Sequence, residues 1–176
     1  NISKTDIWPL EAKWIQVNSP VELHIYDALG NHLGPAPDGI MEYGIPNAQY
    51  DVLGHDKTAA LPEGILYTVV LSGTDTGDFD LRLMDVVSDS VVSTALFKDL
   101  PVMTGTLATV VFDPAMQYIM QIDQDGDGTV DMETPPTVVL DEQASADRTP
   151  PLTTIQLAGT RSAGGRTQRH GPFTPA

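Results

Sequence analysis

The chain has 176 residues, of which 41% are hydrophobic, and it carries a formal net charge of −15 and no cysteine. The length fits one ordinary domain and part of a second, and no apolar run approaches the roughly 18 residues that a membrane-spanning helix needs. The negative charge argues against nucleic acid and anionic lipid as partners, because both bind basic surfaces. The lack of cysteine excludes disulfides, thiolate zinc sites and cysteine nucleophiles.

The first ten residues, NISKTDIWPL, are interpreted as a lead-in to the first domain. They lack the basic start and the apolar core of a signal peptide. Export is still compatible with a sequence that has no cysteine. We therefore expect the sequence to be a piece of a longer polypeptide, or a processed product of one, and we expect an extracellular location.

Residues 11–122 show the pattern of strands joined by turns. In the stretch VELHIYD, the apolar residues Val21, Leu23 and Ile25 alternate with polar residues. This two-residue period is typical of a half-buried strand. A turn is expected at Gly30, and another at PAPDG, because Gly and Asp-Gly tolerate left-handed backbone while proline presets φ.

The apolar stretch Ile65–Gly73 predicts a central strand, and the next stretch alternates with Phe79, Leu81 and Leu83 facing inward. Further strand patterns follow in VVSTALF, TLATVVF and QYIMQID, at a spacing of about 8–12 residues. No stretch has a helical period over two or more turns, and DPAMQY is long enough for one turn only. The pattern predicts an all-β fold over residues 11–122, an antiparallel β-sandwich of immunoglobulin-like or jelly-roll-like type.

The stretch DQDGDGTVD places three aspartates at alternate positions, with a glycine directly after the third. Calcium prefers about six to eight oxygen ligands, and a tightly curled loop aims such side chains at one point. The expected ligands are the side chains of Asp123, Asp125, Asp127 and Asp131 and the backbone carbonyl of Thr129. Four clustered carboxylates repel one another without a cation. We therefore predict a structural Ca²⁺ ion, with a solvated acidic turn as the alternative.

The motif departs from the EF-hand loop at its twelfth position, Thr134, where that loop has a bidentate glutamate; Glu133 comes one place earlier. The flanking segment QYIMQI favours a strand rather than a helix. The loop resembles instead the D-x-D-x-D-G-x-x-D calcium loops between strands of integrin-like and other extracellular repeats, which use the ninth position, here Asp131, as the last side-chain ligand. The resemblance implies an ion that stiffens the junction after the sandwich.

The composition changes after this calcium-binding loop, which we assign to residues 123–134. Residues 135–150 are rich in proline and acidic side chains, which favours a linker with one short strand at TVVL. Residues 151–176 open with the strand pattern LTTIQLAGT, interpreted as the truncated start of a second β module. They end in a Gly- and Arg-rich tail that we expect to be disordered.

Recognisable catalytic motifs are absent from the sequence, including G-x-S-x-G, phosphate-binding loops and H-E-x-x-H. Acidic pairs such as Asp78 and Asp80 are weak evidence for glycoside hydrolysis, because a glycosidase needs two carboxyls at a set separation across a cleft. His24 and His32 can approach each other across the hairpin at Gly30. We assign them no ligand role, since surface hairpin histidines are more often solvated, and we predict that the chain is not an enzyme.

The stretch NSPVELHIYDALGNHLG resembles the SPV-x-L-x-V-x-D-x-x-G opening of accessory β-sandwich modules in large secreted bacterial and archaeal proteins. YGIPNAQYDVLG is similar to the E-I-P-x-A-x-Y of that family, and LPEGILYTVVLSGTDTGDFDLRL to its P-x-G-x-Y-x-V-x-L-x-G-T-x-x-G-x-F-x-L. The match covers about Ser19 to Leu83. Such modules occur beside catalytic domains, including secreted α/β hydrolases of the GPI-inositol-deacylase-like type, and have no catalytic residue to transfer. TPPLTTIQLAGT also resembles the first strand of the Ig-like modules that often follow.

These observations predict a non-catalytic, calcium-stabilised extracellular module that serves as a spacer, accessory or surface-attachment domain of a larger secreted protein. Its expected partners are the neighbouring domains of that polypeptide, with a cell-surface or polysaccharide ligand as a further class. Two alternatives stay open. One is the C-terminal remnant of a secreted α/β hydrolase of lipase or esterase type, and the other is a carbohydrate-binding module.

Overall fold

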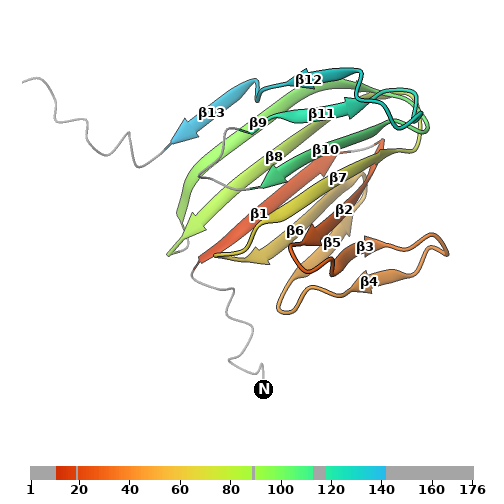
Figure 1. Ribbon diagram of the computed structural model, residues 1–176. Coiled ribbons are helices and arrows are strands. Elements are labelled where there is room, and N and C mark those ends of the chain that lie inside the picture. The colour runs from red at the N-terminus through yellow and green to blue at the C-terminus, as the bar shows by residue number, and fades with distance from the viewer. Residues whose placement is uncertain (1–10, 19, 89, 113–117, 142–176) are drawn as a thin grey trace, which may run out of the picture.

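The computed structural model describes residues 11–18, 20–88, 90–112 and 118–141. In this part of the chain the regular structure is entirely β (Figure 1), and it contains no helix able to span a lipid bilayer. Several expectations fall outside the described residues: the lead-in, most of the segment DPAMQY, the start of a second β module and the disordered tail.

Thirteen strands follow one another along the described chain. Their bounds are β1 Glu11–Asn18, β2 Val21–Asp27, β3 His32–Pro35, β4 Met41–Tyr43, β5 Gln49–Leu53, β6 Asp56–Pro62, β7 Tyr67–Gly73, β8 Gly77–Val87, β9 Ser90–Val102, β10 Leu107–Phe112, β11 Met120–Asp123, β12 Met132–Thr134 and β13 Val138–Asp141.

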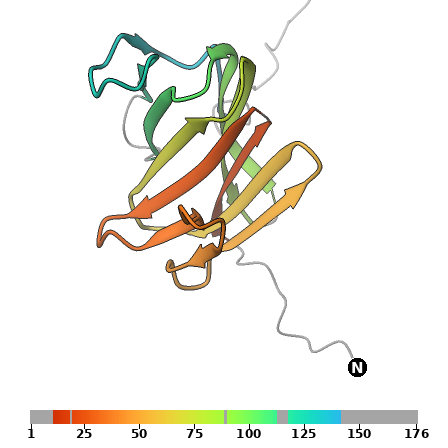
Figure 2. The same ribbon diagram turned by 90° about the vertical axis from the view of Figure 1, so that its right-hand side faces the viewer.

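The strands form two antiparallel sheets. One sheet has the order β13-β9-β8-β1-β6-β5, and the other has the order β12-β11-β10-β7-β2-β3-β4. The two sheets face each other as layers, with β3 and β4 at one margin and the connection between β11 and β12 at the opposite one (Figures 1 and 2). The predicted all-β sandwich is therefore confirmed.

The core consists of the inward-facing residues of both sheets. Every side chain expected to face inward on β2 and β8 is buried, including Leu23 and Leu81, which have no exposed surface. The predicted central strand is β7, in the middle of the seven-stranded sheet. It begins at Tyr67, because Ile65 and Leu66 before it lie exposed in the preceding turn. The two-residue alternation thus fixes which face of β2 and of β8 packs.

The sheets extend beyond Ile122, where the sequence pattern ended the sandwich. Strand β12 pairs with β11, and β13, inside the expected linker, pairs with β9. These two short strands form edges of different sheets. The chain after the aspartate-rich loop therefore crosses from one sheet to the other.

A charged pair lies in the interior of the sandwich. Lys13 on β1 is 2% exposed, and its Nζ lies 3.0 Å from Oδ1 of Asp85, its direct neighbour on β8. The Oδ2 of Asp85 accepts a hydrogen bond from Ser93 on β9 at 2.6 Å. The Lys13 ammonium also lies 4.6 Å from the centre of the Phe112 ring and 3.7 Å from Glu63. Buried ions of this kind are stable only while their partners are present.

We expect Asp85→Ala to lower the free energy of unfolding by about 3–5 kcal/mol, because the Lys13 ammonium would stay buried without its nearest counter-charge. Urea unfolding followed by circular dichroism measures the change. The double variant Lys13→Met/Asp85→Leu should recover most of the loss, since apolar residues of similar volume replace a buried ion pair at little cost. A loss below about 1 kcal/mol in Asp85→Ala, the range of surface ion pairs, would contradict the interior role of the pair.

Candidate metal centre

The loop between β11 and β12 is organised by one buried carboxylate. Asp123, the last residue of β11, is 7% exposed. Its Oδ1 accepts hydrogen bonds from the backbone N–H groups of Gly126 at 2.8 Å and Asp127 at 3.2 Å. Its Oδ2 accepts a third from Gly128 at 2.8 Å. A single side chain therefore curls the chain around itself, as short acidic side chains do in turns.

Two glycines make this curl sterically feasible. Gly126 and Gly128 have φ values of 74° and 91°, in the left-handed region that residues with a Cβ rarely adopt. The bend predicted after the third aspartate is therefore present at Gly128. Gly126 has a second constraint, because a Cβ there would lie 2.6 Å from the carbonyl oxygen of Gly105. The loop thus packs directly on the turn between β9 and β10.

That turn holds the base of the loop through Thr106, which is 1% exposed. The hydroxyl of Thr106 donates to the carbonyl of Gln124 at 2.7 Å and accepts from the N–H of Met103 at 3.1 Å. Asp131 closes the other end, since its Oδ2 accepts from the N–H of Gln124 at 2.8 Å and its own N–H donates to Ile122. Thr106 is not recognisable from the sequence, because no local pattern relates it to Gln124, 18 residues later.

Three of the four predicted carboxylates converge. Asp123, Asp125 and Asp131 each present one oxygen, and these oxygens all lie within 4.8 Å of one another. Asp127 is not in this group, and its Oδ1 accepts from the N–H of Thr129 at 2.7 Å. The converging group could hold a metal ion. The role of Asp127 and that of the Thr129 carbonyl stay predictions.

The chemistry of the converging group is that of a hard cation site. Its donors are carboxylate oxygens alone, which suit Ca²⁺, Mg²⁺ and Mn²⁺ rather than metals that prefer nitrogen or sulfur. Each of the three carboxylates keeps a lone-pair site beyond those used by the backbone N–H groups, and in Asp123 this site is on Oδ2. Asp125 and Asp131 are exposed, so an ion can reach the group from solvent.

Comparison of the chain with protein-family models, with curated proteins and with solved structures gives no match. The resemblance to accessory β-sandwich modules therefore stays a prediction.

In calcium-free buffer, we expect Asp123→Asn to lower the free energy of unfolding by about 1–3 kcal/mol, the cost of a buried donor without its acceptor. If the new NH₂ group replaces Oδ2, it faces the N–H of Gly128. If it replaces Oδ1, it faces the N–H groups of Gly126 and Asp127. The matched control is Asp125→Asn, whose amide oxygen can still accept the 3.2 Å bond from Asp127. Equal losses in the two variants, measured by urea unfolding in EGTA, would contradict the organising role of Asp123.

Proposed function

We propose that the chain is a non-catalytic, calcium-stabilised β-sandwich module of a larger extracellular protein, in which it spaces, supports or attaches other domains. The observation that carries the proposal is the convergence of Asp123, Asp125 and Asp131 on one side of the connection between β11 and β12. The sequence adds support, because it contains no catalytic motif and carries a net charge of −15.

Calcium fits this loop better than the other hard cations because it accepts irregular sets of about six to eight oxygens at roughly 2.3–2.6 Å. Three carboxylates supply part of such a shell, and Asp127, which is exposed, can turn its carboxylate toward the same point. The Thr129 carbonyl and water would supply the rest. Magnesium is less suited, because it demands near-ideal octahedral geometry and gives up its water reluctantly.

The position of the loop explains what an ion would do mechanically. The loop lies between β11 and β12, at the edge of the seven-stranded sheet, and the chain then crosses to β13 on the six-stranded sheet. An ion that ties Asp123 to Asp131 would fix the start of this crossing. It would also stiffen the end of the sandwich nearest the following part of the polypeptide. Extracellular modules often bind calcium with a Kd of only about 10⁻⁴–10⁻³ M, which is sufficient where calcium is millimolar.

The direct test is urea unfolding of the full chain in Ca²⁺ and in EGTA. A ligand bound only by the folded state, at 100-fold its Kd, should raise the free energy of unfolding by about 2.7 kcal/mol. Asp125→Asn should remove most of this gain, because it takes one charge from the converging group. Asp51→Asn, a change of the same kind at an exposed position of edge strand β5, should keep the gain.

Two results would overturn the proposal. One is equal stability in EGTA and in about 10 mM Ca²⁺, above the weakest Kd that is usual for extracellular modules. The other is a calcium-dependent increase in the free energy of unfolding that Asp51→Asn and Asp125→Asn reduce equally, since that would indicate a general charge effect. Mg²⁺ at the same concentration should give a smaller gain than Ca²⁺.

A further inference from the structure

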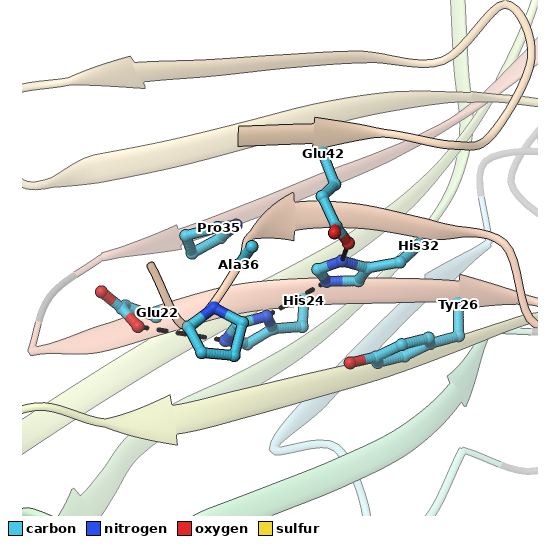
Figure 3. Close-up of a pocket in the computed structure, with 8 residues that line it drawn as sticks. Glu22, His24, Tyr26, His32, Pro35, Ala36 and Glu42 are labelled. Carbon is cyan, nitrogen blue, oxygen red and sulfur yellow. Dashed lines mark hydrogen bonds and ion pairs between the residues drawn. The ribbon is translucent and has the colours of Figure 1, made fainter. Parts of the chain in front are cut away.

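A second cluster of titratable side chains lies toward the other edge of the seven-stranded sheet. The outward face of β2 carries Glu22, His24 and Tyr26, because side chains alternate along a strand. The neighbouring strands add His32 from β3 and Glu42 from β4. Figure 3 shows that Glu22, His24, His32 and Glu42 form a continuous row of facing polar groups.

The four groups are arranged in a definite order. His24 Nδ1 lies 3.2 Å from His32 Nε2, so that the inner nitrogens of the two rings face each other. The outer nitrogens face carboxylates: His32 Nδ1 lies 2.6 Å from Glu42, and His24 Nε2 lies 4.0 Å from Glu22. Each imidazole thus has a carboxylate behind it and the other imidazole in front.

The backbone and a neighbouring ring fix the position of His32. In the β2–β3 register His32 lies opposite Tyr26, whose ring stacks on it with centroids 4.7 Å apart and planes 23° apart. On the other side, Gly34 leaves room for the imidazole, because a Cβ there would lie 3.1 Å from His32 Nε2. The same Cβ would lie 2.7 Å from the carbonyl oxygen of Leu23. The strand register and these neighbours therefore place the His32 ring beside His24.

The pair is accessible from a shallow pocket of about 290 Å³. The side chains of His24 and His32 keep 18% and 13% of their surface exposed. Partial burial and the nearby charge of His32 hold the pKa of His24 below its usual value, while Glu22 opposes this shift.

We propose that His24 and His32 form a binding site for a divalent transition-metal ion of the zinc class, with Glu22 and Glu42 as outer carboxylates and water at the remaining positions. In a tetrahedral site with Zn–N bonds of about 2.0–2.1 Å, two ligand nitrogens lie roughly 3.3 Å apart. The observed separation is 3.2 Å, so the ion needs a tilt of the rings and no movement of the strands.

One arrangement of protons in the cluster is compatible with metal binding. An ionised Glu42 only accepts, so His32 Nδ1 donates to it, and when the His32 ring is neutral its Nε2 keeps a lone pair. His24 Nδ1 then donates to that lone pair. An ion would replace this bridging proton, and His24 would carry its proton on Nε2, facing Glu22. Metal-ligating histidines commonly donate their second N–H to a carboxylate in this way.

Donor chemistry separates this site from the aspartate loop. Imidazole nitrogen suits Zn²⁺, Cu²⁺ and Ni²⁺, whereas clustered carboxylates suit Ca²⁺. The two clusters lie toward opposite edges of one sheet, so each can be titrated while the other is saturated. The inference about the histidines does not depend on the proposed calcium function.

The test is a titration of the full chain with Zn²⁺ in saturating Ca²⁺, by isothermal calorimetry at pH 7.5. We expect one zinc ion per chain with a micromolar Kd. His24→Ala and His32→Ala should each weaken binding at least about tenfold, and Glu42→Gln, which leaves both ligands in place, should weaken it by about 10- to 100-fold. The matched controls His55→Ala and His170→Ala change the other two histidines of the chain and should leave the Kd unchanged.

Thermal unfolding of each variant without zinc checks that it is folded, and NMR of the imidazole nitrogens reports the ligands directly. Zinc should shift His24 Nδ1 and His32 Nε2 and leave His55 unchanged. The proposal is overturned if the natural chain binds no zinc at 100-fold molar excess. It is also overturned if His24→Ala and His32→Ala bind as well as the natural chain, or if Asp125→Asn abolishes the binding.

Discussion

The fold depends on the burial of one face of the central strands in the two layers of the sandwich. Because side chains alternate along a strand, each inward residue such as Leu23 or Leu81 places its neighbours outside. The outward row of β2 is therefore free to carry polar groups. The loop after β11 lies outside the strands and can carry them as well. Lys13 and Asp85 are the exception, since they lie on inward faces and are stable there as a hydrogen-bonded pair.

The two candidate sites differ in how their ligands are brought together. In the aspartate loop the donors are close in sequence, and Asp123 gathers the chain around itself through three backbone N–H groups. In the histidine cluster the donors come from different strands, and the register of β2 and β3 places the rings together. The first arrangement presents carboxylate oxygens and the second imidazole nitrogens.

The carboxylates of the aspartate loop come from one short stretch of sequence, but the residues that hold the loop in place come from another part of the chain. Thr106 and Gly105, from the turn between β9 and β10, hold the loop by a hydrogen bond to Gln124 and by close contact with Gly126. This anchoring aligns the loop with the edge of the sheet before an ion binds. A preformed loop loses less conformational entropy on binding than a free peptide of the same sequence would lose.

The sequence predicted the strand faces, the all-β class and the acidic loop, because these depend on alternation and spacing within a few residues. It did not determine that β12 and β13 complete the sheets, that Thr106 supports the loop, or that Asp127 lies outside the converging carboxylates. It also allowed His24 and His32 to approach without showing that their nitrogens meet at 3.2 Å. These points became visible in the folded chain, because strand order, register and side-chain orientation depend on contacts between residues far apart in the sequence.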